Sequence, residues 1–383
     1  MIKEITEEID RVSRKRGALM KKIISVTAIV LLIAVAGIFL INAKNEDTDV
    51  TKEKTKVGFV LIGSCDDKSY SQSHYEGMQK TAEKLNLDVI YRECVPTDAQ
   101  SKEVMEKLIE EGCKIIICSS YDYGEEIQEV AEAHPDIYFF HATGIKQGKN
   151  LATYFGRIYQ FRYLSGIVAG LQTETNEIGY VAAFPISEVN RGINAFTLGV
   201  KSVNPDAVVY VEWCNSWTDD AATRVAAEKL FDAHDIDVVA MHTDSLRVLE
   251  LAEERGIWSI GYNLDNSENF PNTYLTAPVW QWENYYEPYI LKCLQGKFKG
   301  NNYWEGANTG VVGLAPLTSN VKVGAVQMIE KKKEQFESGM VDVFYGPIRD
   351  NTGNLRVAEG ESMSDAVMLN SFDWYVEGVV VHE

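Results

Sequence analysis

The chain has 383 residues, of which 45% are hydrophobic, so it can bury a sizeable core, and its length suggests two domains or lobes. Its formal net charge is −19, which argues against a nucleic-acid-binding surface, because such a surface needs clustered lysine and arginine. The charge is uneven, since residues 1–22 hold seven basic and four acidic side chains, a net of +3, and the remainder therefore carries −22.

The first predicted element is an apolar segment, Ile23–Ile41, which contains no charged residue. As a helix it would span about 28 Å, close to the hydrocarbon thickness of a bilayer. Basic residues precede it, which favours a cytoplasmic N-terminus and an outer location for the rest of the chain. A cleaved signal peptide is the alternative, but its apolar core is normally only about 7–15 residues long. We therefore expect an uncleaved membrane anchor, followed by a polar tether over residues 42–55.

From residue 56 onward, short apolar runs alternate with longer amphipathic segments. The runs predict strands, and the segments between them predict helices. The predicted strands are 56–63, 87–94, 113–120, 137–144, 177–184, 207–214, 237–243 and 258–263. The predicted helices are 71–85, 98–112, 123–133, 159–173, 187–203, 218–233 and 245–255. Because apolar strands separated by helices occur in two runs, we predict an α/β protein with two doubly wound parallel-sheet lobes.

Ligands of such sheets bind at the carboxyl ends of the strands. The segment 63–72, GSCDDKSYSQ, directly follows the first strand and lacks the glycines and the Lys-Ser/Thr pair of a phosphate loop. Other strand ends carry rings and carboxylates that suit a flat molecule with a polar edge. The candidates there are Tyr121, Phe184, Trp213, Asp244 and Asp265. Aromatic residues at strand ends often only cap a hydrophobic core. The prediction of a ligand site therefore depends on these residues taken together and not on any single one.

Little in the sequence supports catalysis or metal binding. Asp66 and Asp67 could form a catalytic acid pair, but neighbours on a turn usually point apart, and Asp66 could instead cap the following helix. No Ser-His-Asp or Cys-His arrangement can be read from the spacing. The six cysteines contain no CxxC pair, and the six histidines are scattered. We therefore predict buried strand cysteines, no metal, no cofactor and no enzymatic activity.

Five stretches together resemble the BMP (basic membrane protein) family, the substrate-binding proteins of ABC importers that include purine-nucleoside receptors. The stretches are GSCDDKSYSQSHYEG, YFGRIYQFRYLSGIVAG, IGYVAAF, AFTLGVKSVNPDA and GPIRDNTGNLRVAEGESMSDAVMLNSFDWYVEGVV. The resemblance covers about residues 56–383 and implies a type I periplasmic-binding fold, whose two lobes close on a ligand around three crossovers. Lobe one would comprise 56–172 and 275–308, and lobe two 173–274 and 309–383.

The resemblance also implies ligand-binding residues in the first motif. Asp66 falls where the family places an acid at the ligand, and Tyr75 falls on the family's stacking aromatic. Tyr70 and Ser71 occupy the positions that are usually Phe-Asn, and we include both among the candidates.

Two further departures bear on the ligand. Trp280 stands where nucleoside receptors of the family carry a lysine, and Gly192 aligns with their second stacking phenylalanine. If those groups recognise ribose in the family, a free purine base such as adenine fits this chain better than a nucleoside. The C-terminal stretch also resembles the branch thought to bind free nucleobases.

The sequence thus predicts an extracellular binding protein that feeds an ABC permease and its ATPase, attached to the membrane through its N-terminal helix and without a nucleic-acid partner. Three alternatives stay open. The first is a membrane-tethered sensor for a signalling partner, because no lipid-attachment cysteine lies near the end of the apolar segment. The second is an α/β enzyme such as a nucleoside hydrolase, and the third is a receptor for nucleosides rather than bases.

Overall fold

The computed structural model describes residues 53–382, and every structural statement below concerns this part of the chain. The predicted anchor at 23–41 and most of the predicted tether lie outside it. Within the described part, no helix combines the length and apolar composition that a bilayer crossing requires.

The first lobe is built on a sheet of six parallel strands in the order β12-β5-β4-β3-β1-β2. The strands are β1 Lys56–Val60, β2 Asp88–Arg92, β3 Ile115–Cys118, β4 Tyr138–Ala142, β5 Leu151–Gly156 and β12 Asn302–Glu305. The helices are α2 Tyr70–Leu85, α3 Ala99–Glu110, α4 Gly124–Ala133 and α9 Glu283–Leu294, with the short η1 Tyr121–Tyr123 before α4.

Both faces of this sheet are buried, which explains its uninterrupted apolar strands. Alternate residues of a strand point to opposite faces. Ile115 and Ile117 of β3 pack in the hydrophobic cluster that contains Met78 of α2, whereas Ile116 packs with side chains of α3 and α4. A strand covered by helices on both sides therefore carries a continuous apolar run, without the alternation of polar and apolar residues seen in half-exposed strands.

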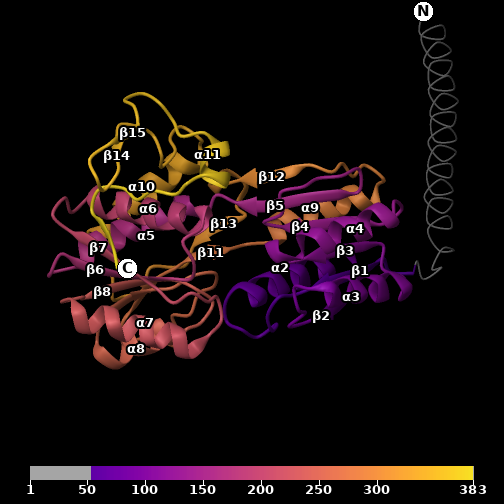
Figure 1. Ribbon diagram of the computed structural model, residues 1–383, viewed down its shortest axis with the longest axis horizontal. Helices are drawn as coiled ribbons and strands as arrows, with labels where there is room; N and C mark the ends of the chain where they lie inside the picture. The colour runs from indigo at the N-terminus through magenta and orange to yellow at the C-terminus, as the bar shows by residue number, and fades with distance from the viewer. Residues whose placement is uncertain (1–52, 383) are drawn as a thin grey trace, which may run out of the picture. The chain divides into compact units, whose positions relative to one another are not determined.

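The second lobe repeats this construction with the strand order β10-β9-β8-β6-β7-β16, again all parallel. Its strands are β6 Glu177–Ala182, β7 Val208–Trp213, β8 Val238–His242, β9 Trp258–Ile260, β10 Tyr274–Thr276 and β16 Val379–Val381. Its helices are α5 Tyr159–Gln172, α6 Ser187–Lys201, α7 Asp220–Ala233 and α8 Arg247–Arg255. In Figure 1, α5 and α6 lie on one side of β6, β7 and β8, and α7 and α8 lie on the other.

The chain crosses between the two sheets three times. It builds β1–β5 in the first sheet and β6–β10 in the second, returns for β12, and ends with β16 in the second. Two of the crossing segments, β11 Pro278–Trp280 and β13 Val312–Leu314, pair antiparallel with each other. The prediction of two doubly wound parallel-sheet lobes is confirmed, while the predicted residue boundaries of the lobes stay a prediction.

The remaining elements pack on the second lobe and the crossings. They are η2 Ala307–Thr309, α10 Ala325–Glu337, β14 Ile348–Arg349, β15 Leu355–Val357 and α11 Asp365–Asn370. The segment after α11 is fixed to α6 by buried amides, because Asn190 Nδ2 donates to the carbonyl of Phe372 at 3.0 Å and Asn194 Nδ2 donates to that of Trp374 at 2.8 Å.

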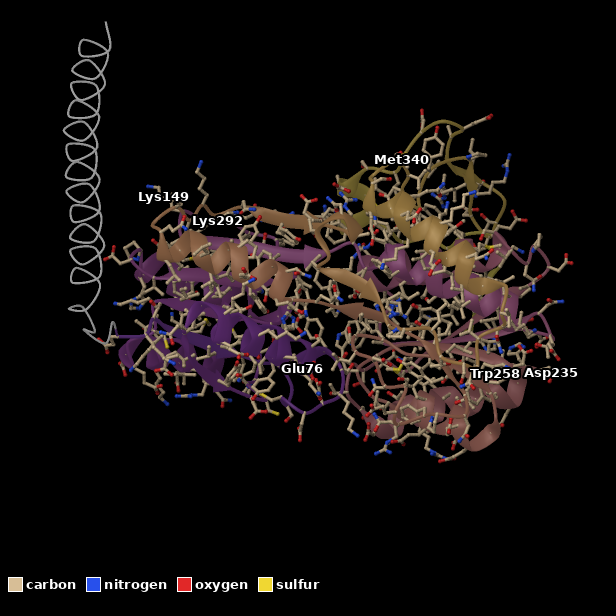
Figure 2. The ribbon with its side chains drawn as sticks, turned by 180° about the vertical axis from the view of Figure 1, so that it is seen from behind. Glu76, Lys149, Asp235, Trp258, Lys292 and Met340 are labelled. Carbon is tan, nitrogen blue, oxygen red and sulfur yellow. The ribbon has the colours of Figure 1, made fainter. Side chains whose placement is uncertain are left out.

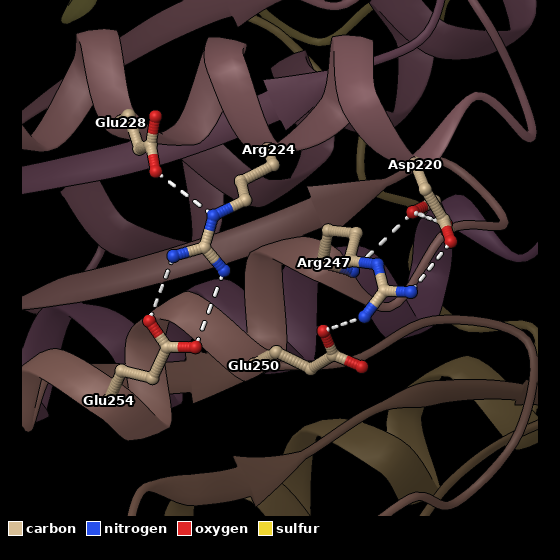
Figure 3. A network of polar contacts seen from close by, with 7 residues as sticks. Asp220, Arg224, Glu228, Arg247, Glu250 and Glu254 are labelled. Atoms are coloured by element: carbon tan, nitrogen blue, oxygen red, sulfur yellow. Dashed lines mark hydrogen bonds and ion pairs between the residues drawn. The ribbon is translucent and has the colours of Figure 1, made fainter.

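The outer surface of α7 and α8 carries a network of ion pairs centred on two arginines (Figure 3). The pairs are Arg224–Glu228, Arg224–Glu254, Arg247–Asp220 and Arg247–Glu250. These side chains are exposed to solvent, so each pair contributes at most about 1 kcal/mol. The network aligns two neighbouring helices, whereas the apolar faces beneath supply most of the stability.

Candidate functional site

Four side chains from both lobes form a hydrogen-bonded group where the lobes meet, and we call Ser69, Asp244, Asn263 and Trp280 the interlobe polar group. Ser69 precedes α2 in the first lobe, and its hydroxyl donates to Asp244 Oδ1 at 3.2 Å. Asn263 Nδ2 donates to the same carboxyl oxygen at 2.8 Å and to Ser69 Oγ at 2.9 Å. Trp280 Nε1 donates to Asn263 Oδ1 at 2.9 Å. The group thus links the carboxyl ends of strands in the second lobe to the first helix of the first.

The first turn of α2 is shaped so that the Ser69 side chain is free to reach across. The carboxylate of Asp67 caps the helix, and the hydroxyl of Ser69 does not. This carboxylate accepts backbone N–H bonds from Ser69, Ser71 and Gln72 at 2.8–2.9 Å. Burial raises the pKa of Asp67, although these hydrogen bonds at the helix N-terminus act in the opposite direction and favour the carboxylate. The side chain of Ser71 turns back into the loop, where its Oγ accepts from Gly63 N at 3.0 Å.

Asp244 is held in an environment that disfavours its charge. Burial is the main cause that raises its pKa to about 8, and the negative charge of Asp67 raises it further, whereas the hydrogen bonds from Ser69 and Asn263 act in the opposite direction. Near neutral pH this carboxyl is therefore largely protonated. A protonated carboxyl is both a hydrogen-bond donor and an acceptor, unlike a carboxylate.

A second set of polar side chains lies beside Asp244 in the second lobe. His242 Nε2 donates to Glu188 Oε1 at 3.2 Å, and the hydroxyl of Tyr262 donates to the same oxygen at 3.3 Å. Burial and the charge of Arg162 lower the pKa of His242 to about 4, so this imidazole is neutral. Burial acts to raise the pKa of Glu188, but its interactions with His242 and the charges of Arg191 and Arg162 together outweigh that effect and leave the pKa lowered.

Arg162 is fully buried beneath this set. Its guanidinium carbon lies 3.8 Å from the ring centroid of Tyr262, and its Nη1 donates to the carbonyl of Met241 at 2.8 Å. Its Nε and Nη2 make no hydrogen bond to any described residue. Buried donors without partners are rare in folded proteins, so acceptors from outside residues 53–382 are expected at this place.

A stack of aromatic rings in the first lobe ends at the interlobe polar group. Trp280 stacks on Trp282 at 4.3 Å between ring centroids, and Trp282 stacks on His74 at 4.3 Å. Tyr70 meets His74 edge-on at 4.5 Å. Burial raises the pKa of Tyr70, and the charges of Asp244 and Glu188 act in the same direction. Tyr70 thus packs edge-on against the last ring of this stack.

The predicted site residues divide into two sets. Tyr70, Asp244 and Trp280 are brought together, and Phe184 lies near them because its ring meets Trp217 at 5.8 Å while the Trp217 carbonyl accepts from the backbone N–H of Asp244 at 2.8 Å. Ser71 lies in the same loop but is used to fix it.

The structure does not bring the other predicted residues to this group. Asp66 is exposed and accepts from the hydroxyl of Ser64 at 2.6 Å. The ring of Tyr75 packs on Tyr91 of the edge strand β2 at 4.8 Å. Three further candidates lie on separate loops or strands. Tyr121 is 54% exposed, Trp213 ends β7, and Asp265 is exposed.

The residues that sequence reasoning missed are mostly neighbours of those it named. Ser69 precedes Tyr70, and Asn263 lies two positions before Asp265. Glu188 and Arg162 lie on helices and carry no local signal, because their roles depend on which helix face meets the second sheet.

Comparison with known proteins places the chain among sequence relatives. A family model described as Bmp, ABC transporter substrate-binding protein PnrA-like, matches residues 54–343. A purine-binding protein of Brucella abortus is 34% identical over 351 residues, which are 91% of this chain and 98% of that protein. A putative ABC transporter glucose-binding protein of Haloferax volcanii is 35% identical over 329 residues, 85% of this chain and 81% of that one.

Solved structures share the fold at lower identity. A transcriptional activator of the comK gene from Bacillus halodurans has a TM-score of 0.67 and 23% identity, and it covers 75% of this chain and 99% of its own. An ABC transporter solute-binding protein from Conexibacter woesei has a TM-score of 0.64 and 19% identity, with 75% and 98% covered. The fold, the family model and the sequence relatives agree with the resemblance drawn from the sequence: the chain belongs to the Bmp family of ABC transporter substrate-binding proteins.

Proposed function

We propose that this protein is the extracytoplasmic receptor of an ABC importer and that it captures a purine nucleobase, adenine or a close relative, between its two lobes. The observation that carries the proposal is the convergence of Ser69, Asp244 and Asn263 from both lobes at the carboxyl ends of the second sheet. A ligand bound there would contact both lobes and favour their closure, which a permease can recognise.

The chemistry of Asp244 supports a purine base. Its raised pKa leaves a carboxyl that donates one hydrogen bond and accepts another. The N6 amino group and the N7 of adenine form a donor and an acceptor side by side, which complements such a carboxyl. Tyr70 from the first lobe and Phe184 with Trp217 from the second supply rings for the two faces of a planar ligand. The Brucella abortus relative named as purine-binding adds support from outside the chain.

Trp280 favours a base over a nucleoside. Its indole N–H is already bonded to Asn263, and its ring packs between Trp282 and Phe155, at 4.3 and 4.7 Å between centroids. It therefore has no donor left for the vicinal hydroxyls of a ribose, whereas a lysine there would have several. Leaving a buried polar group unpaired costs about 1–3 kcal/mol.

The first prediction is that adenine binds at least about tenfold more tightly than adenosine, a difference of about 1.4 kcal/mol. Calorimetric titrations of the full-length chain with adenine, hypoxanthine, guanine and their nucleosides would measure it. Glucose belongs in the same series, because one relative carries that name. Tighter binding of nucleosides contradicts the base preference alone, and binding of glucose without any purine contradicts the purine assignment while leaving a solute receptor.

Two pairs of variants locate the site in the same assay. Tyr70→Ala should weaken adenine binding by about 1–3 kcal/mol through lost stacking, and its matched control is Tyr75→Ala, on the other side of α2. Asp244→Ala should weaken binding similarly, and its control is the exposed Asp265→Ala. If the controls weaken binding and the site variants do not, the ligand binds elsewhere.

We further propose that residues 23–41 anchor the receptor in the membrane with its binding lobes outside. The support is the uncharged apolar run and the basic residues before it. The intact mass of the chain extracted from membranes distinguishes an uncleaved anchor from a removed signal peptide.

A further inference from the structure

A lysine-rich surface lies at the end of the first lobe that points away from the second. It is formed by segments 145–150 and 291–302, which contain two and three lysines and no acidic residue. Figure 2 shows Lys149 and Lys292 at this end, whereas Asp235 and Trp258 mark the second lobe at the opposite end. Because residues 23–383 carry a net charge of −22, a surface built without acidic side chains is unusual in this chain.

The two segments meet through a close backbone approach. A Cβ on Gly300 would lie 1.7 Å from the carbonyl oxygen of Gly148, so only glycine allows the loops to come this near. Lys149, Lys299 and their neighbours line a shallow hollow of about 480 Å³. The ring of Phe298 fixes the second loop to the sheet, because it packs on aromatic rings of β4. Lysines from both segments therefore share one surface.

The side chains that form this surface, together called the basic end face, are Lys149, Leu291, Lys292, Leu294, Lys297 and Lys299. All four lysines are exposed, and the lysines that form ion pairs within residues 53–382 lie elsewhere. The two glutamates of α9 already pair with lysines of α2. Leu291 and Leu294 are 39% and 41% exposed. The face thus combines unpaired positive charge with apolar side chains.

The basic end face lies at the edge of the sheet where the chain enters the lobe. The strands β1, β5 and β12 belong to one parallel sheet, so their first residues lie at the same edge. Lys149 lies two residues before β5, Lys299 lies three residues before β12, and the predicted tether ends directly before β1. Ser69 of the interlobe polar group instead follows the carboxyl end of β1. The basic end face and the candidate ligand site are therefore at opposite edges.

The charge along this edge is uneven. Lys114 directly precedes β3 and Lys56 begins β1, which adds positive charge. Asp136 lies two residues before β4 and Asp88 begins β2, and both are exposed. In the strand order β12-β5-β4-β3-β1-β2, Asp88 lies on the side of the sheet opposite to β12. The positive charge is therefore concentrated over β12, β5 and the end of α9.

We propose that the basic end face lies on the membrane and binds anionic lipid headgroups, so that the ligand-binding edge points away from the bilayer. The proposal rests on the membrane anchor proposed above. Residues 42–55 are 14 residues long, and a flexible chain of that length has a mean end-to-end distance of about 20 Å, which keeps this edge near the bilayer. Lysines are attracted to an anionic bilayer, and exposed leucines suit the boundary between headgroups and acyl chains.

A permease is the competing occupant of this face. The basic end face belongs to the first lobe alone, and it lies at the edge away from the interlobe polar group. Contact with this face would therefore not report whether the lobes have closed on a ligand. A lipid surface requires no such report, and its negative charge complements the four lysines.

The test reconstitutes the full-length chain into vesicles of phosphatidylcholine, either alone or mixed with phosphatidylglycerol. A membrane-impermeant amine-reactive reagent labels the exposed lysines, and mass spectrometry gives the labelling rate of each. We expect Lys149 to react at least about threefold more slowly on the anionic vesicles, because each lysine near such a surface contributes about a fivefold preference for contact. Lys229 of α7 in the second lobe is the internal reference and should react equally on both. Salt at about 1 M should remove the difference, because it shortens the Debye length to about 3 Å.

Two triple variants with the same change in net charge locate the contact. The charge around Lys149 is removed by Lys292→Gln, Lys297→Gln and Lys299→Gln combined, and Lys149 should then react at the same rate on both kinds of vesicle. The matched control on α10 combines Lys331→Gln, Lys332→Gln and Lys333→Gln, and it should keep the protection of Lys149. Circular dichroism establishes that both variants fold.

Flotation of the chain with phosphatidylcholine vesicles at high salt tests the anchor separately. A chain that does not float disproves the anchor and, with it, this proposal. A chain that floats but reacts equally on both kinds of vesicle overturns this proposal alone and leaves a protein partner as the occupant of the face. Equal protection of Lys149 in the two triple variants also overturns it. No step uses adenine, so these outcomes are independent of which solute the receptor takes.

Discussion

At the scale of single residues, Asp244 sets the electrostatics of the interlobe polar group. Its carboxyl lies between a hydroxyl and an amide from different elements, and burial together with the charge of Asp67 raises its pKa to about 8 from an ordinary value of 3.8. In the unfolded chain this group would lose its proton near the ordinary value. The folded protein therefore binds this proton more tightly than the unfolded chain between these two pH values.

Asp244→Asn should flatten the pH dependence of stability. The stabilisation due to the neutral carboxyl is fully present below about pH 4 and is lost as the pH rises through about 8, at up to ~1.4 kcal/mol per pH unit. Asparagine keeps a similar shape but cannot ionise. Urea unfolding at pH 6, 7, 8 and 9 should show a smaller loss of free energy of unfolding for Asp244→Asn than for wild type. An equal slope in both proteins, or the same flattening in the exposed control Asp265→Asn, contradicts this account.

The residue scale is also where prediction from sequence is weakest. Strand ends can be located from apolar runs, but the direction of a side chain in the following loop depends on backbone angles that the run does not determine. Asn263, for example, adopts a φ of +70°, which turns its amide toward Ser69. In two places the site holds a near neighbour of the residue chosen from sequence: Asp67 beside Asp66, and Asn263 near Asp265.

At the scale of elements, the tight packing of α5 on α6 explains the glycines in two of the motifs. A Cβ on Gly166 would lie 2.0 Å from the carbonyl oxygen of Phe196, and one on Gly199 would lie 2.0 Å from that of Tyr163. Only glycine permits this approach of two helix backbones. The strands and helices were predictable because both sheets are covered on both faces, and an apolar run there signals a strand. The strand β5 escaped prediction even though all its residues are buried, because no helix separates it from β4.

Gly166→Ala should therefore destabilise the protein by about 1–3 kcal/mol or more, since the methyl group meets backbone that cannot move aside without parting the helices. Gly324→Ala is the matched control, because a Cβ there meets nothing within 4 Å and the residue precedes α10 with an ordinary φ of −76°. Chemical denaturation of both variants measures the difference. Equal stability of the two variants would mean that α5 and α6 can shift apart at little cost.

At the scale of the whole described molecule, residues just before α2 join the lobes in addition to the three crossings. Ser69 bonds Asp244, and the backbone carbonyl of Lys68 accepts from Asn266 Nδ2 at 3.0 Å. Contacts of this kind are invisible in the sequence, because they join positions about 175–200 apart and depend on how the lobes close. A sequence pattern reports on neighbours along the chain, whereas the site is built from neighbours in space.

The last prediction concerns the contact between Ser69 and Asp244. Ser69→Ala removes the hydroxyl that bonds Asp244 Oδ1 and accepts from Asn263 Nδ2, yet leaves the Asp67 cap of α2 intact. If the lost bonds were worth about 1 kcal/mol in the closed state, the apparent affinity for adenine should fall about fivefold, because ligand must then close the lobes against a less favourable equilibrium. Calorimetry measures the affinity, and small-angle scattering of the ligand-free protein should show a larger mean radius for the variant.

Ser64→Ala is the control for this variant, since Ser64 bonds Asp66 and Glu93 within the first lobe and does not reach the second. It should bind and scatter like wild type. The scattering comparison needs no ligand, so it tests the link between the lobes even if adenine is not the solute that this receptor takes. An unchanged radius and an unchanged affinity in Ser69→Ala would mean that the crossings alone set the closed state, and the interlobe polar group would then act on the ligand without acting on closure.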